Sequence, residues 1–181
     1  DGNPIDIKFT SDLRDNQKPV VKKFMEAAEE RGGGIISVPC GFGKTVLALY
    51  LVAALKVKTI VIVHKEFLMD QWKERIEFFL PDAKVGKIQG DVVKIDDKDI
   101  VIGMLQSISM KDYPDEVFNS FGFVIYDECH HLGAEVFSRS LIKVGCRYTL
   151  GLSATPKRAD GLTKVFEWFL GDTVFSIKQR E

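Results

Sequence analysis

The sequence predicts an α/β fold with a mostly parallel central sheet and helices on both of its faces. Short apolar runs rich in Ile and Val alternate with amphipathic stretches along the chain, and this alternation is typical of parallel sheets that are covered on both sides. Glycine and proline separate the stretches, as at residues 32–34 and at Pro81, where they end the preceding helix. The predicted strands are residues 35–38, 59–63, 100–105, 123–126 and 148–152, and the predicted helices are residues 19–31, 45–55, 67–80, 134–144 and 161–170.

Two of the predicted helices differ in how much of their surface is apolar. The stretch 45–55 is apolar on nearly every side, which predicts a helix buried within the fold. The stretch 67–80 places Leu68, Trp72, Ile76 and Leu80 four residues apart, which predicts one apolar stripe against the sheet. Trp72 is therefore interpreted as a core residue.

Charge and cysteine content limit the possible classes of function. The 181 residues include 25 Lys and Arg against 26 Asp and Glu, so a contact with nucleic acid must use a local patch. Three cysteines without a Cys-x-x-Cys pair argue against a disulfide framework and favour a reducing intracellular compartment. No apolar run approaches the roughly 20 residues of a membrane span. The first residue is Asp1 rather than Met, which indicates a piece of a longer protein.

A glycine-containing loop between a predicted strand and a predicted helix is the first candidate site. In this position the loop amides and the helix N-terminus converge on an anion, and glycine lets the backbone approach a phosphate. Lys44 is expected to reach the β- and γ-phosphates of a nucleotide, and Thr45 to offer its hydroxyl to Mg²⁺. Val38 replaces the first glycine of the general pattern G-x-x-x-x-G-K-[ST], so the loop predicts an NTPase without saying which. The loop consists of Pro39, Cys40, Gly41, Phe42, Gly43, Lys44 and Thr45.

The strand predicted at 123–126 ends in two acids, Asp127 and Glu128. Ligands of open parallel sheets bind beyond the carboxyl ends of the strands, so these acids should face the same crevice as the loop. Asp127 is expected to hold Mg²⁺ through its water shell, and Glu128 to orient and deprotonate an attacking water. Together with Lys44 they are the predicted catalytic residues for phosphoryl transfer to water.

Three residues directly after these acids suggest a zinc site as an alternative. They are Cys129, His130 and His131, but consecutive residues rarely converge on one ion and the sequence offers no second cluster. A hydrogen bond from His130 to the strand that carries Ser153 is the favoured interpretation.

Further motifs occur in an order that resembles superfamily 2 helicases of the DEAD/DEAH type. Residues 127–130 resemble the DEAH box, 153–155 motif III, 13–17 the glutamine motif, 63–72 motif Ia, and 103–107 a further strand-contacting motif. The segment 150–162 resembles the XPB and phage-repair branch. Segments 39–45, 64–72 and 127–134 resemble helicases of large nucleocytoplasmic DNA viruses, including poxvirus-type transcript-release helicases. The motifs span nearly the whole chain, and the resemblance implies a three-layer RecA-like P-loop domain.

The resemblance also implies roles for individual residues. Gln17 would read the adenine edge of ATP, with a surface glutamine at a helix start as the alternative. The coupling of hydrolysis to nucleic-acid binding would use His130, Ser153 and Thr155. Contacts with nucleic acid, mainly its phosphate backbone, would use Lys65, Gln106, Ser107 and Arg158, although Arg158 could equally be a solvated loop residue.

The implied organisation has three parts. Residues 1–33 would be an N-terminal segment with the glutamine motif and a leading helix, 34–171 the first RecA-like ATP-binding domain, and 172–181 the start of a linker to a second RecA-like domain. The implied cofactors are ATP and Mg²⁺. The implied partners are DNA or RNA, the second lobe, and transcription or repair machinery, but no membrane. The location would be the cytoplasm or nucleus, or a virion if the protein is viral.

The missing second lobe limits the expected activity, because that lobe supplies the arginine fingers of these enzymes. The chain alone is therefore expected to hydrolyse ATP slowly and not to unwind a duplex. Two other functions remain open: an ATP-binding switch that gates a partner, and a small-molecule P-loop kinase. Glu128 argues against the switch, because a switch needs no water-orienting acid. A kinase needs an arginine-bearing lid, and only Lys157 and Arg158 follow residues 153–155.

Overall fold

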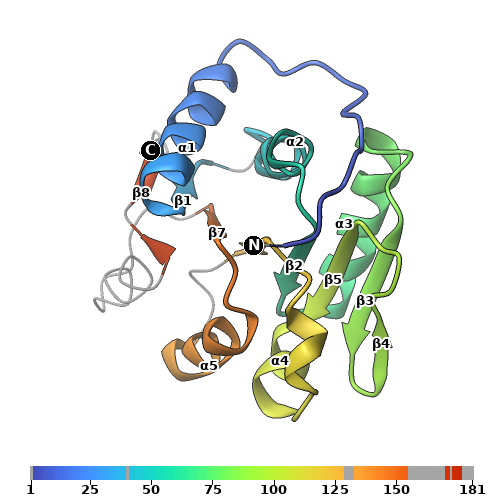
Figure 1. The fold of residues 1–181 in the computed structure, drawn as a ribbon. Coiled ribbons are helices and arrows are strands. Elements are labelled where there is room, and N and C mark those ends of the chain that lie inside the picture. The colour runs from blue at the N-terminus through green and yellow to red at the C-terminus, as the bar shows by residue number, and fades with distance from the viewer. Residues whose placement is uncertain (1, 40, 129–132, 155–169, 172, 177–181) are drawn as a thin grey trace.

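The computed structural model describes residues 2–39, 41–128, 133–154, 170–171 and 173–176 (Figure 1). Its helices are α1 Lys18–Arg31, α2 Lys44–Leu55, α3 Glu66–Phe79, α4 Leu105–Met110 and α5 Ala134–Val144, with a 3₁₀ turn η1 at Asp115–Phe118. Its strands are β1 Gly33–Ser37, β2 Thr59–Val63, β3 Val85–Gln89, β4 Val92–Lys94, β5 Ile100–Met104, β6 Phe123–Tyr126, β7 Tyr148–Ser153 and β8 Thr173–Ser176.

The strands form one sheet in the order β4-β3-β5-β2-β6-β7-β1-β8. Only the pair β3 and β4 is antiparallel among these described strands. The prediction of a mostly parallel sheet is therefore confirmed, and each predicted strand is present. Some predicted bounds were wrong by one or two residues: the strand predicted at 35–38 is Gly33–Ser37, and the one predicted at 148–152 extends to Ser153. The strand predicted at 100–105 ends at Met104, because Leu105 begins α4.

The sequence pattern missed β3, β4 and β8, which lie at or next to the two edges of the sheet. β4 is exposed along its length and β3 is buried only at alternate residues, so neither has the continuous apolar run of a buried parallel strand. β8 falls within 172–181, the stretch expected to begin a linker, and pairs with β1. The domain boundaries themselves stay predictions, and the helix predicted at 161–170 lies outside the described residues apart from its last position.

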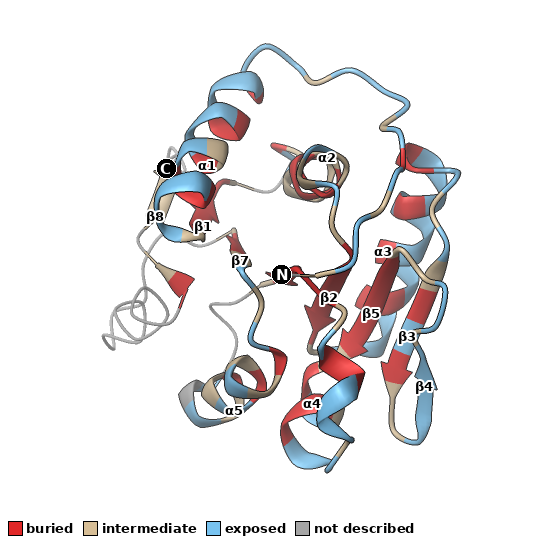
Figure 2. Cartoon of the chain, viewed as in Figure 1, coloured by how far each residue is buried: buried red, intermediate tan, exposed pale blue. Residues whose placement is uncertain are grey.

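Two apolar cores cover the two faces of the sheet, which confirms the three layers (Figure 2). Helices α1, α2 and α3 contribute Phe24, Leu49 and Trp72 to one core. Helices α4 and α5 contribute Ile108 and Phe137 to the other. The central strands between them are buried on both sides. Even α2, the most apolar helix, has only 12 residues, and no helix in the described part of the chain could cross a membrane.

The candidate residues lie together at the carboxyl ends of the central strands. Strands β2, β6, β7 and β1 are consecutive in the sheet and each pairs in parallel with the next, so their carboxyl ends lie on the same side. The segments that follow them are 38–43, 64–65, 127–128 and 154. The arrangement brings residues 39–45, the predicted phosphate-binding loop (hereafter the phosphate loop), and the two acids together, as expected for an open parallel sheet.

Candidate functional site

The phosphate loop is held open by two glycines in the left-handed region of backbone conformation. Gly41 has φ 88° and Gly43 has φ 89°, values that side chains other than glycine rarely adopt. The loop closes through a hydrogen bond from Phe42 N to Pro39 O of 3.2 Å, and α2 then begins at Lys44. A Cβ atom placed on Gly41 would meet nothing within 4 Å. The loop therefore borders open space on this side, where a phosphate could approach its amides. Cys40 lies outside the described residues.

The two acids lie beyond the end of β6 and meet Lys44. The backbone N–H of Asp127 donates to Ile62 O at 3.1 Å, which extends the parallel pairing by one residue. Lys44 Nζ lies 3.5 Å from Asp127 Oδ1 and forms a second ion pair with Glu128. Glu128 has φ 51°, an unusual value for a non-glycine residue that costs on the order of 1–2 kcal/mol. Backbone strain of this kind concentrates at functional sites, because the surrounding structure must impose it.

The residues around Lys44 fit a nucleotide phosphate together with a divalent cation. The Lys44 ammonium and Asp127 Oδ1 are both buried, and neither completes a hydrogen bond of good geometry. A buried charge without such a bond is costly, and phosphate and metal-bound water are groups that would satisfy it. A cleft of about 290 Å³ beside them is also lined by Thr45, Trp72 and Glu128. Two carboxylates at its wall would repel a phosphate, and a divalent cation bound in the cleft would offset that repulsion. Lys44 would hold the phosphate, and Thr45 and Asp127 would hold Mg²⁺.

Gln17 and Arg14 brace the back of the phosphate loop. Gln17 is 2% exposed; its Nε2 donates to Phe42 O at 2.8 Å, and its Oε1 accepts from Arg14 N at 2.9 Å. The Arg14 guanidinium donates to Gly41 O at 3.2 Å and also to Phe42 O. Sequence reasoning assigned Gln17 to the adenine base, and that role stays a prediction. It gave Arg14 no role of its own, because a sequence does not reveal which carbonyls a side chain will meet.

Trp72 joins the site through its polar edge. The side chain is 2% exposed, which confirms its place in the core. However, its indole Nε1 donates to Asp127 Oδ2 at 2.7 Å. The apolar stripe of α3 correctly predicted burial but gave no indication of this partner.

The tyrosine before the acids remains uncharged. The Tyr126 hydroxyl lies 3.0 Å from Ser140 Oγ, and burial raises the pKa of Tyr126 well above its ordinary value. β6 therefore presents charge only beyond its last residue, at Asp127 and Glu128.

Only some of the residues predicted to couple hydrolysis to nucleic-acid binding, or to contact nucleic acid, belong to the described part of the chain. Ser153 is buried at the end of β7, in register with Ser37, and its carbonyl accepts from Val38 N at 3.0 Å, just before the phosphate loop. Backbone pairing thus links the end of β7 to the start of the loop. His130, Thr155 and Arg158 lie outside the described residues.

A hydrogen bond connects the two segments that carry the predicted nucleic-acid contacts Lys65 and Gln106. Gln106 Nε2 donates to His64 O at 3.1 Å, which connects the start of α4 to the end of β2. Lys65 is exposed at the start of α3, with Nζ 5.9 Å from the centre of the Phe67 ring. Ser107 is half-buried, and its Oγ accepts from Gly90 N at 2.9 Å. Lys65 and Gln106 therefore share one edge, whereas the Ser107 hydroxyl is already engaged.

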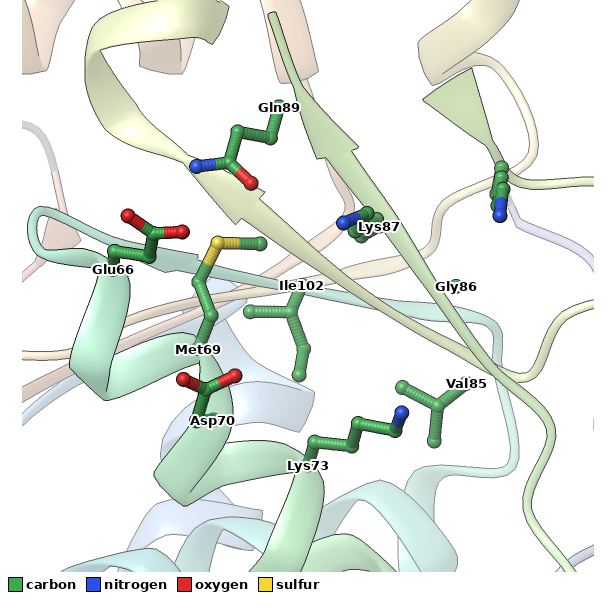
Figure 3. A pocket seen from close by; sticks show the side chains of 10 residues that line it. Glu66, Met69, Asp70, Lys73, Val85, Gly86, Lys87, Gln89 and Ile102 are labelled. Atoms are coloured by element: carbon green, nitrogen blue, oxygen red, sulfur yellow. The ribbon is translucent and has the colours of Figure 1, made fainter. Parts of the chain in front are cut away.

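Helix α3 separates the site from a second cleft, of about 310 Å³, between α3 and β3 (Figure 3). Glu66, Asp70 and Lys73 line it from the helix, and Lys87 lines it from the strand. The figure shows these charged side chains on both walls. The mixture of signs does not select a ligand of either charge.

Comparisons with known proteins place the chain in a family. A family model described as type III restriction enzyme, res subunit, matches residues 10–158. The chain is 39% identical over 175 residues to a protein of Acanthamoeba polyphaga mimivirus named as an ATP-dependent RNA helicase, covering 97% of this chain and 34% of the relative. It is 37% identical over 169 residues to DNA 3'-5' translocase XPB2 of Sulfurisphaera tokodaii, covering 93% and 36%. The chain thus spans about a third of the length of these relatives.

Solved structures agree on the fold. The SWI2/SNF2 ATPase core of Sulfolobus solfataricus in complex with dsDNA matches with a TM-score of 0.76 at 19% identity, covering 93% of this chain and 37% of that one. The UvsW helicase of bacteriophage T4 matches with a TM-score of 0.73 at 21% identity, covering 96% and 64%. At these identities the likeness shows the RecA-like fold alone. With the family match, it leads to one conclusion: the chain belongs to the type III restriction enzyme res-subunit family and has the RecA-like fold of the N-terminal domain of superfamily 2 helicases, and its relatives include helicases of large DNA viruses and XPB-like archaeal proteins.

Proposed function

We propose that the chain is the ATPase lobe of a nucleic-acid helicase or translocase, which binds Mg-ATP at residues 39–45 and contacts one nucleic-acid strand at the neighbouring loops. The observation that supports this most directly is the position of Lys44. Its buried ammonium forms ion pairs with the carboxylates of both Asp127 and Glu128. A cation held there by two acids can change partners when a phosphate enters.

The proposed chemistry follows from these contacts. Lys44 exchanges its pairing with Glu128 for phosphate oxygens, and the loop amides bind the same group. Glu128 then accepts a hydrogen bond from a water and takes its proton as that water attacks the terminal phosphorus. The bond from this phosphorus to the bridging oxygen breaks, and ADP leaves. Thr45 and Asp127 hold Mg²⁺, which when bound neutralises phosphate charge and orients the phosphate oxygens. The unusual backbone conformation of Glu128 sets the direction in which its side chain leaves the main chain.

Replacing Glu128 by Gln separates a motor from an ATP-binding switch. The amide keeps the size of the side chain but cannot accept the proton, so a motor should retain ATP binding and lose turnover by roughly 10²–10⁴-fold. The measurement is steady-state ATPase activity of the two-lobed parent, with ATP affinity measured by calorimetry. Lys44→Ala is the matched variant, since it should lose ATP affinity as well. Unchanged turnover in Glu128→Gln would contradict the motor.

Nucleic acid as the partner is proposed from the shared edge of Lys65 and Gln106. A panel of single- and double-stranded DNA and RNA, added to the two-lobed parent, should stimulate its ATPase activity. Lys65→Gln should weaken that stimulation and reduce its salt dependence, because one phosphate contact is lost. A P-loop kinase would show no stimulation by any member of the panel.

The chain by itself is proposed to be a weak ATPase. It spans about a third of its curated relatives, and the arginine fingers of such enzymes come from outside the first lobe. The purified chain should bind nucleotide, hydrolyse it slowly and fail to separate a duplex. Strand separation by the chain alone would contradict this.

A further inference from the structure

The hydrogen bond between Trp72 and Asp127 joins two side chains that lie 55 positions apart in the sequence. Both are almost fully buried, with exposures of 2% and 4%, so water does not compete for this contact. An indole N–H can only donate, and the Asp127 carboxylate accepts it through Oδ2 at 2.7 Å. A charge-assisted bond of this length is among the stronger hydrogen bonds in proteins.

This bond divides the carboxylate of Asp127 into two differently used oxygens. Oδ2 is taken by the indole, whereas Oδ1 points to Lys44 at 3.5 Å and completes no hydrogen bond. The carboxylate therefore cannot rotate about its Cβ–Cγ bond without losing the indole. Oδ1 is left with its lone pairs available on the side of the cleft that Lys44 and Thr45 line.

Helix α3 places the indole there because of its packing. The helix begins after Lys65 and buries Leu68, Trp72 and Ile76 against the sheet face that also holds Ile125. Trp72 lies where this stripe passes the end of β6 and lines the cleft beside Lys44. Glu66 and Asp70, on another side of α3, line the second cleft (Figure 3). The indole ring fills the core, and its N–H reaches the acid.

We propose that Trp72 is a positioning residue for metal binding: its indole N–H fixes the Asp127 carboxylate so that Oδ1 is presented to the water shell of Mg²⁺. This inference rests on the proposed function. Hydrogen-bond partners of metal-binding groups typically change metal affinity by about 10–100-fold when they are removed. If Trp72 has only a structural role in the core, its substitution should lower stability and leave the metal affinity unchanged.

The test compares ADP binding to the 181-residue chain with and without metal, by calorimetry in excess Mg²⁺ and in excess EDTA. Trp72→Phe keeps an aromatic ring and removes the N–H. We expect the Mg²⁺-dependent gain in ADP affinity to fall by at least about tenfold, while affinity in EDTA stays at the wild-type value. Ile76→Val is the matched control, because it removes buried volume from the same stripe of α3 and should leave the gain unchanged. A Trp72→Phe variant with the wild-type gain would overturn the proposal.

A second measurement covers the case in which Trp72→Phe does not fold. The chain has two tryptophans, so Trp168→Phe leaves Trp72 as the sole indole. Adding Mg²⁺ and ADP should change the emission of Trp72, and the additional Asp127→Asn substitution should abolish the metal-dependent part. If the emission of Trp72 does not respond to Mg²⁺ while calorimetry shows metal-dependent binding, the positioning role is refuted and the proposed function is not. If the wild-type chain shows no metal-dependent nucleotide binding, the proposed function fails with it.

Discussion

Two glycines of the phosphate loop have nearly the same backbone angle but different surroundings, and alanine at each should separate strain from crowding. Gly41 has φ 88° and Gly43 has φ 89°, so alanine at either position carries a conformational penalty of about 1–2 kcal/mol. A Cβ on Gly41 would meet nothing within 4 Å, whereas a Cβ on Gly43 would lie 2.5 Å from Gln17 Nε2 and 3.2 Å from Arg14 Nη2.

The crowding at Gly43 has a calculable consequence. Gln17 is 2% exposed and donates to Phe42 O at 2.8 Å, so it cannot swing into solvent to make room. Losing that bond leaves a buried amide unsatisfied, which costs about 1–3 kcal/mol. Gly43→Ala should therefore lower the free energy of unfolding by about 2–5 kcal/mol, and Gly41→Ala by about 1–2 kcal/mol.

Urea unfolding of both variants, followed by circular dichroism, measures the difference. Gln17→Ala supplies the control: in its background the amide is gone, and the loss caused by Gly43→Ala should shrink to that of Gly41→Ala. Equal losses for the two single glycine variants would refute the reasoning, because strain would then account for both. So would an unchanged Gly43→Ala loss in the Gln17→Ala background.

Three further predictions concern residues outside the phosphate loop. Lys143 Nζ donates to three backbone carbonyls, at residues 108, 109 and 111, over distances of 3.0 and 3.1 Å. Lys143→Met should therefore lower the free energy of unfolding by about 1–3 kcal/mol, and Lys143→Arg should retain part of this stabilisation. Tyr126→Phe removes one hydrogen bond to Ser140, but the Ser140 hydroxyl keeps its bond to the Phe137 carbonyl. The free energy of unfolding should therefore fall by only about 0.5–1.5 kcal/mol. A larger loss of stability than that of Lys143→Met would contradict this expectation. Burial raises the pKa of Cys146 from 9.0 to about 12. Well below pH 9 both states hold the proton, and near and above pH 9 the unfolded chain releases a proton that the folded chain keeps. This thiol therefore makes stability fall as pH rises through about 9 to about 12. At pH 8.5, site-resolved alkylation of Cys146 followed by mass spectrometry should be far slower in the folded chain than in urea, and equal rates would exclude the shift.

Several features of the site followed from local patterns. A strand, a glycine loop with Lys44 and a helix are contiguous in the sequence, and the apolar strand ending in Asp127 is as well. The parallel-sheet rule then required both to meet at one edge, because the carboxyl ends of parallel strands lie on the same side. The ion pairs of Lys44 with Asp127 and Glu128 agree with that expectation.

Edge strands and side-chain partners did not follow from such patterns. β4 is exposed along its length, and β3 is buried only at alternate residues, so neither produces the apolar run that marks a central strand. Arg14 and Gln17 belong to a segment before α1, and only the folded chain brings their polar atoms to Phe42. Periodicity reports which side of an element is buried, and it does not report what that side meets.

The sequence by itself determined the α/β class, the phosphate loop and the acids after β6, because each depends on residues that are neighbours in the chain and on one rule about parallel strands. Only the tertiary structure decided which polar atoms complete the site. Trp72 shows the difference: its four-residue spacing with Leu68 and Ile76 predicted a buried side chain, and burial was confirmed. That its N–H meets Asp127 depends on how α3 lies across the end of β6, a packing relation between segments 55 residues apart.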